Sequence, residues 1–285
     1  MMLAENIRAF FNAPIARLYL VMWGAAFVLM AGEALISLVR KRHLFEWKDS
    51  LANGAMYTGY FLLSALWVPV VYLLYKWCFD HRIASLGTGT WHVGQNGLWW
   101  EWVVLILLED LCFYIFHRVS HHTRLFWASH VTHHSSDHFN LSTAFRQTWV
   151  PQTAVIFWLP LPLLGFDPLM VMSAQTFSLF YQLFLHTQLA PRLGPLEWIH
   201  NTPSHHMIHH GAKEPYVNKN VGGIFIIWDR LFGTFEKASV PIRYGIDPEL
   251  HSRNPLTIAF HEWLAMGRDV LKSRSPRDLW RALAG

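Results

Sequence analysis

Long runs of apolar residues divide the chain into five hydrophobic segments that are separated by polar stretches. A run of about 20 apolar residues is long enough to cross the hydrocarbon core of a bilayer as a helix. The fourth run is short and contains Pro151, Pro160 and Pro162, which favours a kinked or re-entrant helix over a full span. The pattern predicts an all-α integral membrane protein with about four to five transmembrane helices, at residues 16–39, 51–78, 98–116, 150–165 and 168–185.

Two long polar stretches, residues 117–147 and 187–250, follow the third and fifth hydrophobic segments and hold most of the histidines. We expect them to fold together into a histidine-rich helical cap, so that residues 1–285 form a single membrane-bound domain. The last stretch, residues 255–283, mixes Trp and Leu with Lys and Arg. Such a mixture is typical of an amphipathic helix, which lies either at a membrane interface or on an ordinary soluble surface.

The composition supports a membrane environment. Apolar residues make up 53% of the chain and charged residues only 15%, whereas soluble domains carry about 25% charge. The 15 tryptophans suit a protein with two membrane interfaces, where their amphipathic rings settle. No basic stripe interleaved with aromatic residues is present, so we expect no nucleic-acid partner. The two cysteines, Cys78 and Cys112, lack CxxC spacing and imply no disulfide framework.

The distribution of positive charge predicts the orientation in the membrane. If all five segments cross and the loop after the first is cytoplasmic, residues 40–48, 117–147 and 187–285 lie inside. These three stretches hold 19 of the 23 Lys and Arg residues, as the positive-inside rule requires. We therefore expect a multi-pass protein in which every histidine cluster lies on the cytoplasmic face.

Thirteen of the 18 histidines lie between His117 and His210, in clusters with helical spacing. Residues three and four positions apart share one face of a helix. We therefore expect each cluster to point several imidazoles into one volume, near His186 at the end of the fifth segment. The clusters are His117-Arg-Val-Ser-His121-His122, His130-Val-Thr-His133-His134 and His206-Met-Ile-His209-His210.

Three such clusters on one predicted side of the membrane indicate metal binding. Imidazole is a common neutral metal ligand and suits zinc, copper, iron and nickel. Eight or more ligands exceed what one ion accepts, so the clusters predict two metal ions. The HEW at residues 261–263 lacks the second histidine of HExxH, which excludes that zinc protease motif. The alternative is a set of interfacial or pH-sensing histidines, whose burial without a metal would cost desolvation and gain nothing.

Asp110 is the acidic residue that we expect to support these clusters. It lies seven residues before His117, two helical turns back on the same face and at membrane depth. There it would accept the free N–H of a ligand imidazole and fix its tautomer. A structural hydrogen bond is the alternative role.

The histidine spacing resembles that of the membrane-bound fatty acid hydroxylase / sterol desaturase superfamily, whose signatures are HxxxH, HxxHH and HxxHH. Four further stretches resemble its alkylglycerol monooxygenase branch: HHSSDHFNLSTAFRQT, HTQLAPRLGPLEW, NTPSHHMIHHG and NKNVGGIFIIWDRLFGTFE. The resemblance covers about half of the chain. It implies a non-haem diiron centre that lies at the cytoplasmic membrane face and uses O₂ on a lipid.

The resemblance also assigns roles to individual residues. It implies that the two iron ions are held by His117, His121, His130, His133, His134, His186, His206, His209 and His210. The chain departs from the family at His122, where a glutamate is usual, and at Asp137-His138, where the branch has an acidic pair. We expect Asp110, His122, Asp137 and His138 to act in catalysis beside the metal ligands.

The implied function is a diiron, O₂-dependent monooxygenase that hydroxylates an unactivated C–H bond of a lipid. Alkylglycerol or other ether lipids, acyl chains, aminolipids and sterols all remain open as substrates. A lipid desaturase with the same dimetal site is the alternative, because the two reactions differ mainly in how the substrate carbon is placed. A non-enzymatic metal-binding or transport protein is disfavoured, because a transporter should carry its ligands at the bilayer midplane and not at segment ends.

The source of electrons is expected to be external, because no haem or flavin domain is visible in these 285 residues. Resemblance to the alkylglycerol monooxygenase branch implies tetrahydropterin, whereas the wider superfamily implies a separate electron-transfer protein. The other expected partners are O₂, the lipid substrate and the surrounding membrane lipids.

Overall fold

The computed structural model describes residues 14–86 and 99–285, with side chains from Val21 onward. Leu98, the first residue of the third predicted span, lies outside these residues. The described residues form no β-strand and only two isolated bridges, which confirms the all-helical prediction. The helices are α2 (Pro14–Val39), α3 (Trp47–Asp80), α4 (Trp99–His122), α5 (Arg124–His134), η1 (Leu141–Phe145), η2 (Pro151–Trp158), α6 (Pro160–Leu163), α7 (Pro168–Leu183), η3 (Gly194–Trp198), α8 (Pro203–His209), α9 (Ile227–Phe232), α10 (Pro255–Lys272) and α11 (Pro276–Ala284).

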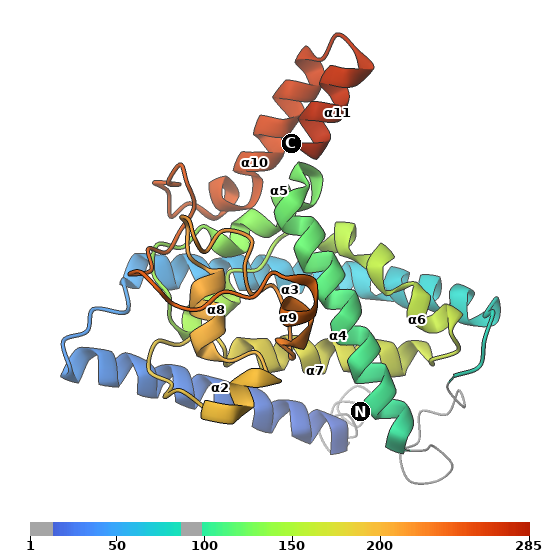
Figure 1. The fold of residues 1–285 in the computed structure, drawn as a ribbon, viewed down its shortest axis with the longest axis horizontal. Coiled ribbons are helices and arrows are strands. Elements are labelled where there is room, and N and C mark those ends of the chain that lie inside the picture. The colour runs from blue at the N-terminus through green and yellow to red at the C-terminus, as the bar shows by residue number, and fades with distance from the viewer. Residues whose placement is uncertain (1–13, 87–98) are drawn as a thin grey trace, which may run out of the picture.

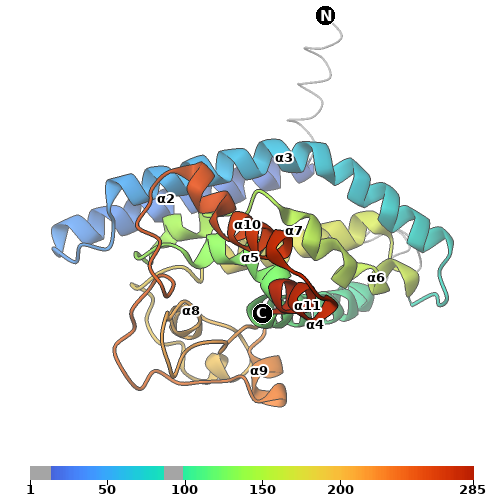
Figure 2. The same ribbon diagram turned by 90° about the horizontal axis from the view of Figure 1, so that it is seen from above.

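The first two long helices, α2 and α3, run side by side along one side of the molecule (Figures 1 and 2). Among the described residues, Val21–Val39 and Trp47–Asp80 are the two helical stretches long and apolar enough to cross a membrane. Many of their apolar side chains point outward, such as Leu62 and Leu66, which are 61% and 75% exposed. Such outward-facing leucines suit contact with lipid.

The fourth predicted segment, residues 150–165, is not one continuous helix. It consists of the 3₁₀-helix η2 followed by the four-residue helix α6, and it ends at Gly165. Proline has no N–H to donate and disfavours helical geometry in the preceding residue, so Pro160 and Pro162 interrupt the helical hydrogen bonding. The expectation of a kinked or re-entrant element agrees with this path, while the number of spans stays a prediction.

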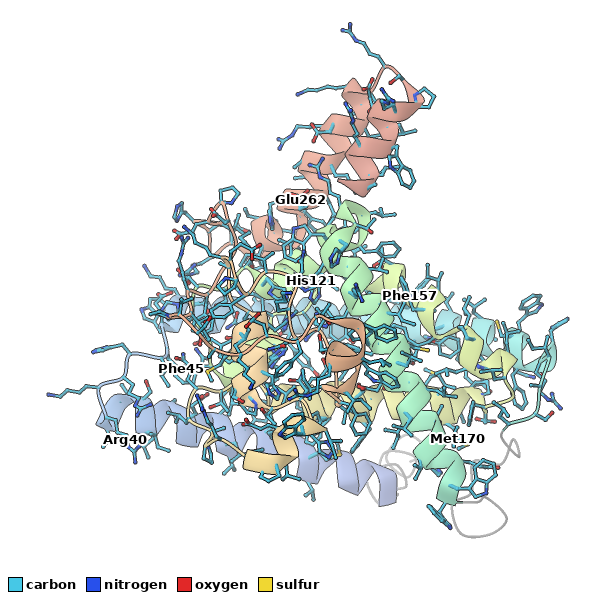
Figure 3. The ribbon with its side chains drawn as sticks, in the orientation of Figure 1. Arg40, Phe45, His121, Phe157, Met170 and Glu262 are labelled. Carbon is cyan, nitrogen blue, oxygen red and sulfur yellow. The ribbon has the colours of Figure 1, made fainter. Side chains whose placement is uncertain are left out.

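Helix α4 lies at the centre of the molecule and crosses the other long helices (Figure 1). It packs against α7, η2 and α6, and these elements close around a buried apolar cluster with α3. Tyr75, Phe113, Trp158 and Met170 belong to this cluster, and Met170 lies near the outer end of α7 in Figure 3. The cluster holds α4 in place, so the histidines at the end of that helix have a fixed position.

The predicted cap is less helical than expected. Helix α5 and the short helices α8 and α9 are present, but most of residues 210–254 is irregular. Figure 2 places α8 and α9 on the side of the molecule opposite α2 and α3. Buried side chains replace helical hydrogen bonds here: Asn220 accepts from the Glu236 N–H and donates to the Glu236 carbonyl. Polar side chains that bond backbone groups allow such a segment to be buried without regular structure.

The predicted amphipathic tail forms two helices, α10 and α11, which project away from the rest of the molecule (Figure 1). Ser275 caps α11 by accepting from the Asp278 N–H, so the single predicted stretch breaks there. One face of α10 is buried against α5 and α3. Arg124 of α5 joins α10 through Glu262 at 2.6 Å and Asp269 at 2.8 Å. Leu264 on the outer face is 63% exposed.

A buried ion pair connects the start of α3 to the segment that follows α5. The guanidinium of Arg146 is fully buried and bonds the Asp49 carboxylate. It also donates to Asn53 Oδ1 at 2.7 Å and to Ser135 Oγ at 2.9 Å. Because Ser135 directly follows the second histidine cluster, this network fixes the end of α5.

We expect Arg146→Met to lower the free energy of unfolding by about 3–5 kcal/mol, because it leaves the buried Asp49 carboxylate without its partner. Unfolding of the purified protein in detergent, followed by circular dichroism, measures the loss. The control is Arg243→Met, which removes an exposed pair with Glu249 and should cost less than about 1 kcal/mol. Equal losses in the two variants would contradict a supporting role for the buried pair.

Candidate metal centre

Nine histidines converge at one place in the fold and form two groups. In each group, one ligand nitrogen from every histidine lies within 4.8 Å of those of the other members. The first group combines histidines from α4, α5 and α8, and His121 marks its place in Figure 3. The groups are His117, His121, His130, His134 and His209, and His133, His186, His206 and His210.

Each HxxHH cluster divides its histidines between the two groups. His130 and His134, one helical turn apart on α5, enter the first group, while His133 enters the second. On α8 the assignment is reversed: His206 and His210 enter the second group and His209 the first. Each cluster therefore does point two imidazoles into one volume, but the third histidine of each HxxHH enters the other group, because i and i+4 share a helix face more closely than i and i+3.

Backbone carbonyls determine the tautomer of three of these histidines. The Nδ1 atoms of His117, His209 and His186 lie 2.7, 2.9 and 2.9 Å from the carbonyl oxygens of Val221, Lys219 and Gln182 respectively. A carbonyl oxygen only accepts hydrogen bonds, so each Nδ1 carries the proton. The Nε2 atom of each ring is then unprotonated and presents its lone pair to its group.

The ring nitrogens inside each group lie within hydrogen-bonding distance of one another. In the first group, His130 Nε2 lies 2.8 Å from His117 Nε2 and 3.0 Å from His134 Nε2. In the second group, His186 Nε2 lies 3.0 Å from both His133 Nε2 and His206 Nε2.

Some of these nitrogens have no hydrogen-bond partner at all. The buried Nε2 atoms of His121 and His209 lack any partner among the described residues. Converging lone pairs and unpartnered buried nitrogens both cost free energy, and one cation in each group would satisfy them together. The donor set therefore fits two metal ions.

Burial keeps the cluster uncharged at neutral pH. The loss of hydration lowers the pKa of His133 to about 4 and that of His209 to about 3. Burial also lowers the pKa of His134 and His206 well below the usual value, and neighbouring imidazoles lower it further. Neutral imidazole is the form that binds metal ions, so no proton has to be displaced.

The loop of residues 219–225 supplies two of the carbonyls and is held by two buried aspartates. Asp229 accepts from the N–H groups of Val221 and Gly222 at 2.8 Å each. Asp110 accepts from the Ile224 N–H and, at 3.0 Å, from the Phe225 N–H. The two carboxylates thus fix the loop, and the loop fixes the orientation of two imidazoles.

Asp110 does not contact an imidazole, contrary to the expected hydrogen bond to a ligand N–H. That N–H belongs to His117 and is bonded to the Val221 carbonyl instead. Asp110 bonds the loop and also the indole of Trp228, at 2.9 Å. Close approach of the loop to α4 requires glycine, since a Cβ at Gly223 would lie 2.6 Å from Asp110 Oδ1. Asp110 therefore acts on the histidines through the backbone.

Three other predicted site residues lie outside both groups. His122 bonds the Arg118 carbonyl through Nδ1 at 2.8 Å. Asp137 and His138 pair with each other at 3.0 Å, and Asp137 accepts from Arg253 at 2.9 Å. With Asp49 they form a third cluster of metal-binding residue types, but its carboxylates are already neutralised by arginine.

An apolar cavity of about 530 Å³ reaches the histidines from the side of the long helices. It lies between α2, α3, α4, η2 and α7. Most of its surface is aromatic or aliphatic, with Trp67, Phe113, Phe116, Phe145, Trp158 and Leu183 among the lining residues. Members of both histidine groups form its inner end: His117, His130, His133, His186 and His206.

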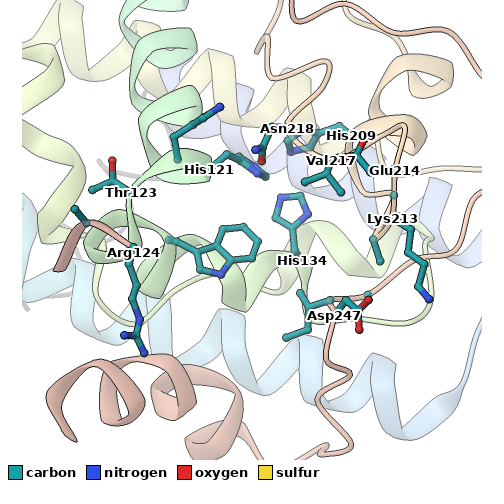
Figure 4. A pocket seen from close by; sticks show the side chains of 18 residues that line it. His121, Thr123, Arg124, His134, His209, Lys213, Glu214, Val217, Asn218 and Asp247 are labelled. Atoms are coloured by element: carbon teal, nitrogen blue, oxygen red, sulfur yellow. The ribbon is translucent and has the colours of Figure 1, made fainter. Parts of the chain in front are cut away.

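A second cavity of about 880 Å³, here called the polar cavity because charged side chains lie around it, borders the first group. Figure 4 shows His121, His134 and His209 at its floor, with Lys213, Glu214 and Asp247 around its rim. His122, Arg124 and Trp127 also line it. Histidines of the first group therefore border both the apolar cavity and the polar cavity.

Comparison with known proteins finds a family and individual relatives that match this part of the chain. The profile of the Fatty acid hydroxylase family matches residues 102–234. Alkylglycerol monooxygenase of Homo sapiens is 43% identical over 164 residues, which is 57% of this chain and 36% of that protein. Alkylglycerol monooxygenase of Danio rerio is 47% identical over 148 residues, 52% of this chain and 33% of that protein. Residues 102–234 of this chain therefore resemble the fatty acid hydroxylase family.

A more distant relative is named for a different lipid. Ornithine lipid hydroxylase OlsE of Rhizobium tropici is 29% identical over 141 residues, 49% of this chain and 43% of that protein. The chain spans only about a third of the length of the alkylglycerol monooxygenases that it matches. No solved structure matches the chain.

The family match contains the whole histidine arrangement. Residues 102–234 include all nine histidines, Asp110, Asp229 and the loop between them. The similarity to alkylglycerol monooxygenases confirms the resemblance first noticed in the histidine spacing and in stretches such as NTPSHHMIHHG.

We expect the metal-free protein to lose stability as the pH falls from about 6.5 towards 4. The unfolded chain takes up protons near pH 6.5, whereas the buried imidazoles do not, so stability is fully present only above that pH. Unfolding midpoints of chelator-treated protein across this pH range measure the effect.

His133→Gln should reduce this pH dependence, because it removes one of the buried groups with a depressed pKa. His251→Gln is the control, since that side chain is 82% exposed and should leave the slope unchanged. A midpoint that does not vary with pH in the parent protein would contradict the burial of neutral histidines.

Proposed function

We propose that this chain is a diiron, O₂-dependent membrane monooxygenase that hydroxylates an unactivated C–H bond of a lipid. The proposal rests on one observation: nine histidines, six of them buried, present their nitrogens in two groups at the end of an apolar cavity. Relatives named alkylglycerol monooxygenase, ornithine lipid hydroxylase and cholesterol 25-hydroxylase support a lipid as the substrate.

The nine histidines would hold two iron ions, five around one and four around the other. Imidazole nitrogen suits iron among several transition metals, and the family resemblance favours iron. The bound iron pair would supply the activation of O₂ and the removal of hydrogen from the substrate. The remaining requirements, namely orientation of the substrate and exclusion of water, fall to the protein.

The apolar cavity would hold the hydrocarbon part of the lipid against the histidines. Its lining by Phe113, Phe116 and Phe145 offers few hydrogen-bonding groups, so water is disfavoured beside the reacting carbon. Because the cavity borders α2 and α3, a lipid can approach from the membrane that we propose these helices cross. We propose a multi-pass protein with this site on its cytoplasmic face.

The polar cavity would serve the reductant. It reaches His121, His134 and His209 without passing through the apolar chamber. An external electron donor, either a tetrahydropterin or an electron-transfer protein, could therefore act while the lipid remains bound. Lys213 and Arg124 together with Glu214 and Asp247 give this cavity a mixed charge.

Comparative lipidomics of cells with and without the chain tests the reaction. A lipid that is heavier by one oxygen only when the chain is present supports hydroxylation, whereas the loss of two hydrogens would identify a desaturase. Labelling with heavy O₂ should place the label in the new hydroxyl group. Unchanged lipids combined with metal flux would indicate a transport protein instead.

We expect His134→Ala to abolish lipid oxidation and to lower the iron content of the purified protein, because it removes one nitrogen from the first group. The matched control is His261→Ala, a lone histidine on α10 that lies in neither group and should leave both readouts unchanged. Full activity in His134→Ala with unaltered iron would refute the assignment.

A further inference from the structure

Glu109 lines the apolar cavity with a carboxyl oxygen that has no partner. The residue lies on α4 and is 1% exposed. Its Oε1 atom accepts from the indole N–H of Trp158 at 3.1 Å. Its Oε2 atom is buried and has no hydrogen-bond partner among the described residues. A carboxyl group at this depth costs free energy unless a partner satisfies it.

Polar side chains from two other helices accompany Glu109 at this end of the cavity. Gln175 of α7 donates to the hydroxyl oxygen of Tyr75 on α3, at 3.2 Å. Ser178, one turn further along α7, accepts from the Gln182 side chain at 3.2 Å. All four residues line the cavity. They form a polar group, here called the distal polar site, inside a chamber that is otherwise mostly apolar.

The distal polar site and the histidines lie at separate places along the same cavity. Glu109 precedes His117 by eight residues on α4, and a helix rises 1.5 Å per residue, so their backbones are about 12 Å apart. Phe113 and Phe116 line the cavity between the two positions on that helix. A ligand that contacts both ends must therefore be apolar in its middle.

We propose that the distal polar site binds a hydroxyl group of the lipid, with Glu109 Oε2 as its hydrogen-bond partner. The substrate class is then a lipid whose hydroxyl is separated by an apolar stretch from the carbon beside the histidines. This assignment deepens the proposed monooxygenase function. The position of the hydroxyl relative to the oxidised carbon depends on that function, whereas binding of the hydroxyl does not depend on it.

The chemistry of the site favours a hydroxyl over other head groups. A hydroxyl donates one hydrogen bond and accepts two, so it can serve Oε2 of Glu109 and also accept the Tyr75 proton. An ammonium group only donates, so it could pair with Glu109 Oε2 but would leave the Tyr75 O–H without an acceptor. An ether or ester oxygen only accepts and would leave Oε2 unpartnered.

Competition binding tests the distal polar site directly. The full chain is purified without iron and placed in phosphatidylcholine nanodiscs, and tritiated hexadecanol is displaced by unlabelled hexadecanol, hexadecane or hexadecyl methyl ether. We expect hexadecanol to bind about tenfold more tightly than hexadecane, the ratio for one buried hydrogen bond. The ether, which cannot donate, should bind about as weakly as the alkane.

Glu109→Leu should reduce the preference for the alcohol to less than about threefold, because it replaces the acceptor with an apolar side chain. Leu107→Met is the matched control: this side chain lies on the same helix but does not line the cavity, and the substitution conserves volume, so the tenfold preference should remain. If Glu109→Leu does not fold, the three ligands compared on the parent protein still decide the question.

Three results would overturn the proposal. Equal binding of hexadecanol and hexadecane would mean that water alone satisfies Glu109. Equal binding of hexadecanol and the ether would mean that no donated proton is recognised. An alcohol preference that is unchanged in Glu109→Leu would place the hydroxyl elsewhere. Because these measurements use iron-free protein, they remain valid if the proposed oxidation fails.

A second readout connects the distal polar site to the reaction. In the iron-loaded parent protein, oxidation of hexadecanol should fall at a fixed distance from its hydroxyl group, whereas Glu109→Leu should spread it over several carbons. An absence of oxidation together with the expected binding preference would count against the proposed function and leave the hydroxyl site intact.

Discussion

Hydrogen bonds from imidazole N–H groups to backbone carbonyls are the interaction on which the rest of the structure depends. Val221, Lys219 and Gln182 each accept from Nδ1 of a histidine, and so turn the opposite nitrogen towards its group. Without these bonds, either tautomer of each ring would be available and the lone pairs would not converge. The aspartates that bond the loop of residues 219–225 act on the same feature, because they hold the carbonyls in position.

The histidine content of the site could be predicted from the sequence, because helical spacing and the family signature are both local patterns. The division into two groups could not, since it depends on how α5 and α8 face each other across the fold. The contact of Asp110 was mispredicted for a similar reason: a loop more than 100 residues later in the chain occupies its carboxylate. The importance of Glu109 was also missed, although a second carboxylate beside Asp110 in an apolar run was a signal for it.

For the fold as well, features that depend on local sequence could be predicted, and features that depend on long-range contacts could not. The apolar runs predicted α2, α3, α4 and α7 to within a few residues. The irregular path of residues 210–254 was predicted as helical, because nothing in its composition reveals which buried side chains bond its backbone. Asn220 is the example: its amide bonds Glu236, so it replaces hydrogen bonds that a helix would otherwise make. Its backbone adopts a positive φ of 52°, a conformation that asparagine tolerates better than most residues.

The alternation of histidines on α5 and α8 has a consequence for the spacing of the two centres. His133 and His134 are adjacent in sequence yet serve different groups, so a single peptide unit bridges from one centre to the other. The same is true of His209 and His210 on the facing helix. The backbones of α5 and α8 thus connect the two histidine groups at two places. The two histidine groups could not move apart without unwinding a turn of helix, so their spacing is fixed by the backbone.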